Sequence, residues 1–450
     1  MSVAVFFVSR KRPGFDPQWG AFIERSVRKQ LPDAFFYGPL ADDEAVKHSI
    51  NDAKRNGADV FIISQPTMGD GNLATVFAAE WDAPLIVWAT PENPDNPKVS
   101  ACGLTGAHNW ASYLAQIGKP PLVVYGLPNT AEVVNDLNAA IRQARAIRKL
   151  KHGKVALIGG HAPGFLNMAV DAAALQQLLG TRLKQIGLHE FINVVRSLPG
   201  ELVAEDVRKT KALNIPIRSG VELSDNVFDI SSRYYLALKQ LIREESLDAV
   251  ALRCWGELPN ELGVWAYLAV ARLSDEGVNI CEEGDIDGAL GVLLAAELVP
   301  QAAAFNTDWL EHDDETITLW HAGATPFLLT EKHELDVHFN TNKPVVVDSK
   351  LLSGIPVTLF RFWRFNNEYR LAIIEGTTEA VPRHIDGFSG TVRVQNGGIK
   401  EFFLDALTAG MPHHITVVKG HIAKQLKRLA KHYQPKPVDV VLELNTGGQR

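Results

Sequence analysis

Cysteine is scarce in this sequence of 450 residues, which contains only Cys102, Cys254 and Cys281. An odd and thinly spread set does not make a secreted disulfide framework, so we expect a reducing compartment, the cytoplasm. Basic residues are not in surplus either, since 45 lysines and arginines face 52 aspartates and glutamates, a formal net charge of −7. Without a basic surplus to neutralise a phosphate backbone, a nucleic-acid partner is not expected.

Long apolar runs are missing as well. The apolar stretch at residues 289–299 is cut by Glu297 and falls short of the roughly 20 apolar residues that a membrane-spanning helix needs. We therefore expect no membrane role. The apolar run at 3–8 is followed by basic residues at 10–12, whereas a secretory signal places its basic residues first, so this run predicts a strand.

The composition is that of an ordinary globular protein, with 46% hydrophobic and 22% charged residues. These values exclude intrinsic disorder, collagen-like repeats and a coiled coil. At about 100–200 residues per domain, the length corresponds to about two to four domains.

Short apolar runs alternate with amphipathic segments in the first third of the chain. This alternation is typical of βαβ units around a parallel sheet and predicts an N-terminal α/β domain at residues 1–150. Loops after the carboxyl ends of such strands often bind ligands, which makes the loops at 65–72 and 90–94 candidates. Ordinary turns explain both loops at least as well. The expected strands are 3–8, 60–64, 85–89 and 122–125, and the expected helices are 17–31, 73–81 and 131–149.

A second α/β domain is predicted at residues 151–300, where the same rhythm resumes. Its first strand runs into a glycine-rich turn at 159–164 that lacks the dinucleotide and P-loop patterns, so we interpret it as a tight strand-to-helix turn. From about residue 315 the runs become short and rich in β-branched and aromatic residues, which indicates a mainly antiparallel, barrel-like C-terminal domain at 301–450. The expected elements of the second domain are strands 155–158, 249–252 and 278–280 and helices 231–244 and 261–273.

Four carboxylates fall within six residues, at 282, 283, 285 and 287, between a predicted strand and a predicted helix. Capping of the helix N-terminus accounts for some of them. Carboxylates at the end of a strand also bind divalent cations, and an oxygen-rich site with an imidazole suits manganese or magnesium. The cluster alone leaves the two interpretations open. Asp308 after an apolar run and the pair His413-His414 before a strand add candidate ligands, although adjacent histidines on an extended chain point to opposite faces.

At these residues the chain resembles the L-fucose isomerase and L-arabinose isomerase superfamily, specifically its shorter fucose-isomerase-like members. Residues 283–290 are similar to the family's Glu-x-Asp-x-x-Gly segment, residues 305–308 to its second carboxylate segment, and His414 with Gly420-His421-Ile422 to its imidazole segment. The resemblance implies that Glu283, Asp308 and His414 bind a metal ion, Mn²⁺ or alternatively Mg²⁺ or another divalent cation.

The resemblance further implies an aldose–ketose isomerase for a pentose or deoxyhexose, working through a cis-enediol intermediate. The metal ion would polarise the carbonyl, and Glu283 and Asp308 would be the acid–base pair. Trp255, in a segment similar to the family's Cys-Trp segment, and His321, in His-Ala-Gly where shorter members often have His-Cys-Gly, are weaker candidates for substrate contact.

Related isomerases are hexamers, so a homo-oligomer, hexamer or trimer, is expected. Trp88, the loop at 65–72 and the basic residues at 10–12 would then close over a neighbouring subunit's site, although surface turns explain them equally well. Two alternatives remain: a related metal-dependent enzyme acting on an acidic or phosphorylated sugar, and a non-catalytic sugar-binding homologue.

Overall fold

The computed structural model describes residues 2–9, 14–299, 303–395, 397–433 and 438–444. The chain forms two compact units, one made of Met1–Lys151 with Lys431–Pro437 and the other of His152–Ala430 with Val438–Arg450. The division into three domains at residues 150 and 300 stays a prediction. The fold class is confirmed, because two parallel-sheet α/β parts precede a large, mainly antiparallel sheet.

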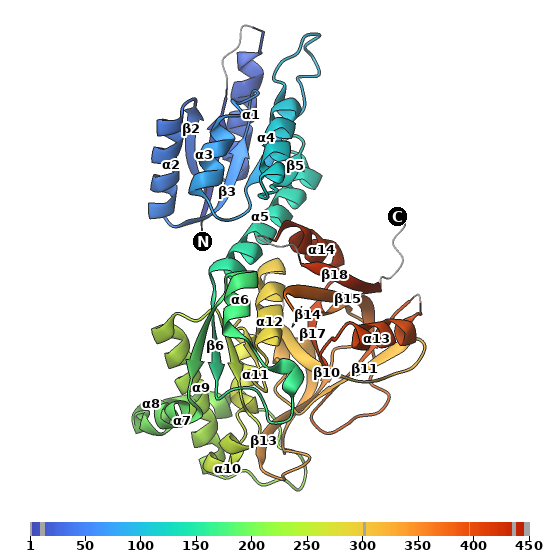
Figure 1. The fold of residues 1–450 in the computed structure, drawn as a ribbon. Helices are drawn as coiled ribbons and strands as arrows, with labels where there is room; N and C mark the ends of the chain where they lie inside the picture. The colour runs from blue at the N-terminus through green and yellow to red at the C-terminus, as the bar shows by residue number, and fades with distance from the viewer. Residues whose placement is uncertain (1, 10–13, 300–302, 396, 434–437, 445–450) are drawn as a thin grey trace. The chain divides into compact units, whose positions relative to one another are not determined.

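The first unit is built on a parallel sheet with strand order β2-β1-β3-β4-β5. Helices cover both faces of this sheet (Figure 1), so its central strands are buried on both sides, as in other doubly wound folds. Its strands are β1 (Ser2–Val8), β2 (Phe35–Leu40), β3 (Ala58–Ser64), β4 (Ile86–Ala89) and β5 (Leu122–Tyr125). Its helices are α1 (Pro17–Gln30), α2 (Asp43–Arg55), α3 (Leu73–Glu80), α4 (Gly103–Gln116) and α5 (Ala131–His152), the last ending in the second unit.

Side-chain caps fix the loops of the first unit. Asp16 accepts hydrogen bonds from the backbone N–H groups of Gln18 and Trp19 at the start of α1, which satisfies donors that the helix leaves free. Glu92 accepts three backbone N–H groups of the segment 100–102. The carboxylate of the candidate loop at 90–94 is therefore occupied by hydrogen bonds to the neighbouring segment 100–102.

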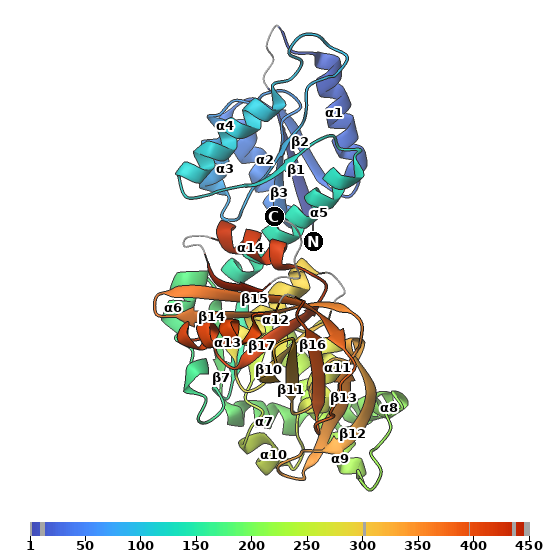
Figure 2. The same ribbon diagram turned by 90° about the vertical axis from the view of Figure 1, so that its right-hand side faces the viewer.

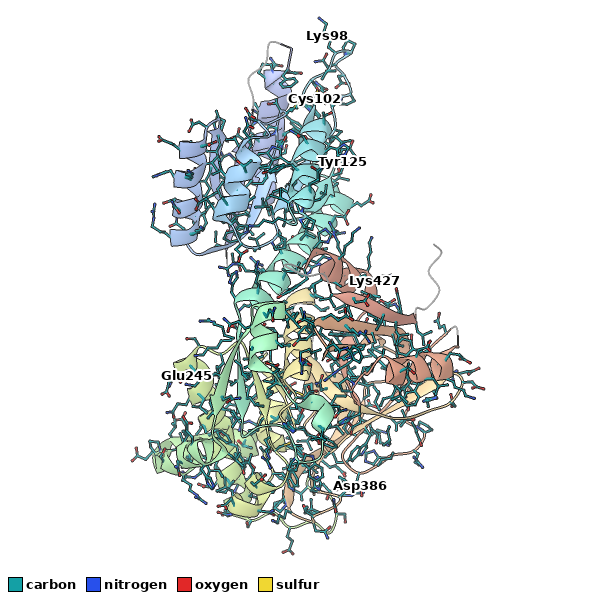
Figure 3. All side chains as sticks on the ribbon, in the orientation of Figure 1. Lys98, Cys102, Tyr125, Glu245, Asp386 and Lys427 are labelled. Atoms are coloured by element: carbon teal, nitrogen blue, oxygen red, sulfur yellow. The ribbon has the colours of Figure 1, made fainter. Side chains whose placement is uncertain are left out.

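The second unit begins with a parallel sheet in the order β7-β6-β8-β9. Glu245, labelled in Figure 3, ties the first two of these strands together by accepting from Lys154 and Lys184 at 2.8 and 2.9 Å. The strands are β6 (Lys154–Ile158), β7 (Arg182–Ile186), β8 (Ala249–Leu252) and β9 (Ile280–Cys281). The helices are η1 (Leu166–Met168), α6 (Ala172–Leu179), α7 (Leu188–Ser197), α8 (Gly200–Ala212), α9 (Asp225–Glu245), α10 (Glu257–Leu262) and α11 (Tyr267–Asp275).

The helix predicted at 261–273 is wrong in extent. Gly263 adopts φ +76° and ends α10, and α11 starts only at Tyr267. A left-handed residue cannot continue a right-handed helix, and glycine adopts it without steric cost.

The C-terminal strands form a mixed, mainly antiparallel sheet in the order β12-β13-β16-β11-β10-β17-β14-β15-β18. Because β16 also pairs with β15, the strands from β16 to β15 close into a barrel. Figure 2 turns these strands toward the viewer. The elements are β10 (Ala304–His312), β11 (Thr316–His321), η2 (Phe327–Leu329), β12 (Thr330–Val337), β13 (Pro344–Leu351), β14 (Pro356–Phe365), β15 (Glu368–Glu379), β16 (Phe388–Arg393), α13 (Ile399–Thr408), β17 (His414–Lys419), α14 (Ala423–His432) and β18 (Asp439–Leu444).

Helix α12 (Ile286–Leu298) joins the two parts of the second unit. It lies between the parallel strands and the barrel strands (Figure 1), and contacts β6, β8 and β9 on one side and β10, β14 and β17 on the other. It is apolar on nearly every face because both sides are buried. We call α12 the seam helix, because it lies between the parallel sheet and the barrel. The acidic residues at its N-terminus lie between these two parts as well. Among the described residues, no helix combines the length and apolarity needed to cross a membrane.

Candidate active site

The three predicted metal ligands come together from three elements of the second unit. Glu283 lies in the turn between β9 and α12, Asp308 lies on β10, and His414 is the first residue of β17. β10 and β17 are antiparallel neighbours with Asp308 directly opposite His414, a position at which side chains share one face of the sheet. The seam helix α12 brings Glu283 to the same place.

Short distances join these side chains. His414 Nε2 lies 3.3 Å from Glu283 Oε2 and 3.6 Å from Asp308 Oδ1. His413 Nε2 lies 3.9 Å from the same glutamate oxygen and 3.8 Å from the same aspartate oxygen. Glu283 is buried, His414 is fully buried, and the Asp308 side chain is 23% exposed. The centre is therefore open on the Asp308 side.

Glu283 is held by a strained turn. Its φ is +61° and that of Gly284 is +73°, the region that side chains rarely adopt. The Glu283 carbonyl accepts from the Ala162 N–H at 2.7 Å, and the Gly284 N–H donates to the Leu252 carbonyl at 3.1 Å. A Cβ on Gly284 would lie 2.1 Å from the carbonyl oxygen of Gly160. This position needs glycine for both backbone conformation and space.

Three atoms at the centre have no hydrogen-bond partner within the part of the chain that the structure describes. They are Glu283 Oε2, Asp308 Oδ1 and His414 Nε2, and all are buried. Leaving buried polar atoms unsatisfied is costly unless a ligand or ion completes them. Two carboxylate oxygens and one imidazole nitrogen form a donor set that suits Mn²⁺ or Mg²⁺. The residues present therefore fit a divalent cation.

A second layer of polar groups lies behind His414. Its Nδ1 donates to Asp285 Oδ2 at 2.8 Å. Asp285 in turn accepts from Arg361 through two hydrogen bonds of 2.6 and 2.9 Å and from the Gly288 N–H at 3.0 Å. Arg361 comes from β14 and is 1% exposed. The carboxylate that caps α12 thus also orients the imidazole.

Burial and charge oppose each other at this centre. Burial raises the pKa of Asp285, but the guanidinium of Arg361 outweighs it, so the carboxyl pKa lies well below its ordinary value. Burial also raises the pKa of Glu283, and the imidazoles of His413 and His414 bring it below the ordinary value. Burial lowers the pKa of His414, but Asp285 and its neighbours raise it well above the ordinary value. Without a cation, the carboxylates are charged and His414 holds a proton.

Sequence reasoning assigned no role to three of these residues. His413 faces the same centre as His414, although alternation predicts opposite faces. That expectation is wrong because His413 lies in a bend before β17 begins. Asp285 was only one of four clustered carboxylates. Arg361 had one signal, a charge inside an apolar strand, where only a paired charge is tolerated.

The weaker substrate candidates lie in different places. His321 is buried with its ring 5.8 Å from that of His414. The ring of Trp255 is 5.1 Å from that of His338 in an edge-on contact. Trp88 belongs to the core of the first unit, where its indole N–H donates to the Gly126 carbonyl at 3.1 Å. The basic residues at 10–12 lie outside the described residues.

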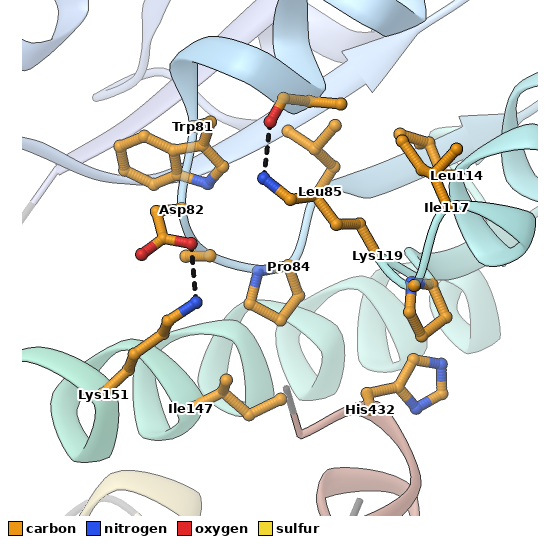
Figure 4. Close-up of a pocket in the computed structure, with 14 residues that line it drawn as sticks. Trp81, Asp82, Pro84, Leu85, Leu114, Ile117, Lys119, Ile147, Lys151 and His432 are labelled. Carbon is orange, nitrogen blue, oxygen red and sulfur yellow. Dashed lines mark hydrogen bonds and ion pairs between the residues drawn. The ribbon is translucent and has the colours of Figure 1, made fainter. Parts of the chain in front are cut away.

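A cavity of about 390 Å³ lies in the first unit (Figure 4). Its cations are paired, since Lys151 lies 2.6 Å from Asp82 and Lys119 donates to the Ala78 carbonyl. It contains none of the predicted site residues. The candidate active site is therefore the cluster around Glu283.

The comparisons with known proteins point to the same chemistry. The family model for the L-fucose isomerase C-terminal domain matches residues 346–439. Over this segment the chain is similar to the fucose isomerase-like family. Curated sulfoquinovose isomerases resemble it over most of its length: that of Alkalicoccus urumqiensis is 23% identical over 387 residues, covering 85% of this chain and 86% of the relative. That of Priestia aryabhattai is 24% identical over 393 residues, covering 86% and 87%, and that of Clostridium sp. (strain MSTE9) is 24% identical over 385 residues, covering 82% and 84%.

These relatives and the fucose isomerase-like family confirm the predicted enzyme class, an aldose–ketose isomerase. The roles of Glu283, Asp308 and His414 stay predictions, which the geometry described above supports.

Proposed function

We propose that this protein is a metal-dependent isomerase that converts a sulfonated aldose to its ketose. The observation that carries the metal dependence is the convergence of three buried, unpartnered ligand atoms, on Glu283, Asp308 and His414. The sulfonated substrate rests on the curated relatives, which are sulfoquinovose isomerases. It corresponds to the acidic-sugar alternative from the sequence.

The reaction moves one hydrogen between two neighbouring carbons of the sugar. A divalent ion held by Glu283, Asp308 and His414 would polarise the carbonyl and make the adjacent C–H more acidic. One of the two carboxylates takes the proton from C2 and returns it to C1. The other carries the hydroxyl proton from O2 to O1. The two transfers balance, so that no oxidant or reductant is needed.

The chain's own groups prepare this proton transfer. The lowered pKa of Glu283 keeps its carboxylate ionised, as a base must be. His414 is held in one orientation by Asp285. Asp308, at 23% exposure, is the more accessible of the two carboxylates. We assign the transfer of the hydroxyl proton between O2 and O1 to Asp308, which solvent can reach. We assign the transfer of the carbon-bound proton between C2 and C1 to the buried Glu283.

A neutral deoxyhexose is the second candidate substrate. The match of residues 346–439 to the L-fucose isomerase C-terminal domain favours it. A pentose is the other neutral sugar that the family resemblance implies. A direct comparison of sulfonated and neutral aldoses separates these possibilities.

The test is ketose formation by purified protein that has been stripped with EDTA and then supplied with Mn²⁺ or Mg²⁺. We expect turnover of the sulfonated aldose to vanish on stripping, to return with metal, and to be absent in Glu283→Gln. Asp287→Asn is the control, since Asp287 is a half-buried carboxylate in the first turn of α12 that accepts from the Tyr369 hydroxyl and the Arg364 backbone N–H instead of facing the centre. Metal binding without turnover of any sugar would instead support a non-catalytic sugar-binding protein.

Three further features belong to the proposal. Manganese is the expected ion, with magnesium as the alternative. The expected assembly is a homo-oligomer, a hexamer or a trimer, which light scattering of the purified protein measures directly. The expected compartment is the cytoplasm, in keeping with free cysteines at all three positions.

A further inference from the structure

A second group of unsatisfied polar atoms lies outside the metal centre. Arg253 Nε, Trp255 Nε1 and Glu257 Oε2 are buried atoms without a hydrogen-bond partner in the described parts of the chain. They fall within five consecutive residues. Unsatisfied groups are rare in native structures, so three in one short segment indicate a surface completed by a ligand.

This segment, residues 253–257, lies where a parallel sheet binds ligands. It follows β8, whose neighbour in the sheet is β6. The sheet order β7-β6-β8-β9 places the topological switch point between β6 and β8, because β7 lies on one side and β9 on the other. Ligands of open α/β sheets bind at the carboxyl ends of strands at this point.

Packing connects the segment with the turn that holds Glu283. The Gly284 N–H bonds to the Leu252 carbonyl, next to Arg253. A Cβ on Gly284 would meet Gly160, and a Cβ on Gly159 would lie 3.3 Å from the Arg253 side chain. The segment is therefore adjacent to the metal centre, separated from it by two glycines.

The chemistry of the segment suits an anionic, hydroxylated ligand. Arg253 Nη1 donates to the Gly159 carbonyl at 3.2 Å and Nη2 donates to Glu257 Oε1, which holds the guanidinium in place and leaves Nε without a partner among the described residues. Arg253 Nε and Trp255 Nε1 are donors only, and sulfonate oxygens are acceptors only. Glu257 Oε2 is an acceptor, which suits a sugar hydroxyl.

We propose that residues 253–257 bind the end of the sugar remote from the reacting carbons. Arg253 and Trp255 donate to the sulfonate group, and Glu257 accepts from a neighbouring hydroxyl. Arg253 is then the residue that selects a sulfonated sugar over a neutral one. This inference rests on the proposed function.

The test compares Arg253→Gln with wild type on two sugars that differ only in the sulfonate. The measured quantities are KM for the sulfonated aldose and the inhibition constant of the same sugar without sulfonate. We expect KM to rise about 10- to 100-fold, the effect of losing a charge-assisted hydrogen bond. The inhibition constant of the neutral sugar is expected to change less than about threefold. Glu257→Gln is expected to weaken both sugars by the same factor, because both carry the hydroxyl.

Arg233→Gln is a matched control. The Arg233 side chain is also 19% exposed, pairs with a carboxylate four residues away, and donates to backbone carbonyls, but it lies on α9. It is expected to leave both constants unchanged. If Arg253→Gln unfolds, Arg253→Lys keeps the positive charge but lacks the planar set of N–H donors of the guanidinium. Its KM for the sulfonated sugar is expected to lie between that of the wild type and the value expected for Arg253→Gln.

The outcomes separate the two proposals. Equal weakening of both sugars by Arg253→Gln, or an unchanged KM for the sulfonated sugar, overturns the inference. Absence of wild-type turnover on the sulfonated aldose overturns the proposed function instead.

Discussion

Asp285 Oδ2 lies 2.8 Å from His414 Nδ1. Because an ionised carboxylate only accepts, Nδ1 must carry a proton, and Nε2 is the nitrogen left to face Glu283 and Asp308. Arg361 holds the carboxylate through two hydrogen bonds. One hydrogen bond therefore fixes both the orientation and the tautomer of the imidazole that a metal ion would bind.

Asp285→Asn is expected to weaken Mn²⁺ binding about 10- to 100-fold, the usual effect of losing the acceptor behind a metal-binding histidine. The amide can turn its NH₂ group toward Nδ1 and favour the wrong tautomer. Isothermal titration calorimetry measures the affinity, and ¹⁵N NMR of the histidine side chains reports the tautomer. Asp287→Asn, which leaves the His414 contact intact, should keep wild-type affinity. Equal losses in the two variants would contradict this role.

The stability contributions of the two partners of the buried pair Asp285 and Arg361 are expected to be non-additive. Arg361 and Asp285 are each 1% exposed. Arg361→Met leaves a buried carboxylate without its cation and should lower the free energy of unfolding by about 3–5 kcal/mol. The double variant Asp285→Asn/Arg361→Met should lose less than the sum of the single variants. Urea unfolding of the metal-free proteins gives the coupling energy between the two residues. If the losses of the two single variants add up to that of the double variant, the two side chains do not stabilise the fold as a pair.

Gly284→Ala tests the turn that carries Glu283. The new Cβ would lie 2.1 Å from the Gly160 carbonyl oxygen at a φ of +73°. Gly263→Ala is the control, since its φ is +76° but no atom lies within 4 Å of the new Cβ. The control should lose about 1–2 kcal/mol from backbone strain alone, and Gly284→Ala about 1–3 kcal/mol more from the clash. Thermal unfolding measures the stability loss of each variant. Similar losses in the two variants would show that the backbone at Gly160 moves away from the new Cβ without cost.

Metal affinity is expected to rise with pH. The pKa of His414 in the metal-free protein is well above its ordinary value, so a cation must displace its proton. Affinity should increase up to about tenfold per pH unit between pH 6 and 8 while His414 stays protonated. Glu283 and Asp285 have lowered pKa values, and the pKa of Cys281 is raised to about 12, so these neighbours do not titrate in this range. Calorimetry in buffers of different protonation enthalpy should detect one released proton.

The same shift predicts how the metal-free protein responds to pH. Because the folded pKa of His414 is raised, the stability from its bond to Asp285 is fully present below about pH 6.5, the ordinary histidine value. It is lost as pH rises through the folded pKa. Thermal unfolding from pH 6 to 9 should therefore show the metal-free protein losing stability toward alkaline pH. A flat profile in Asp285→Asn would assign the change to this pair.

The sequence predicts the alternating elements of the parallel sheets well. β5 and β8 have the predicted bounds, because buried parallel strands are short apolar runs between clear turn residues. β2 and β7 were missed, since they lie at sheet edges and mix polar with apolar residues. The division of 261–273 into two helices depends on the backbone conformation of Gly263, which periodicity does not report.

The carboxylates and imidazoles drew attention because they stand next to recognisable strand ends, and the family resemblance then selected Glu283, Asp308 and His414 among them. Their surroundings were not predicted, because the partners come from distant segments. Asp285 meets Arg361 across 76 residues and His414 across 129 residues. Such pairings depend on the closure of the barrel and on the seam helix. Local patterns contain no information about either.

The seam helix α12 separates two tasks within one unit. The candidate metal ligands lie on the turn before α12, on β10 and on β17, whereas Arg253 and Trp255 lie in the loop after β8 and Glu257 begins α10. A change in that loop leaves the barrel pairing of Asp308 with His414 untouched. If both proposals hold, substitutions in this segment would change which sugar binds without changing the groups that move the proton.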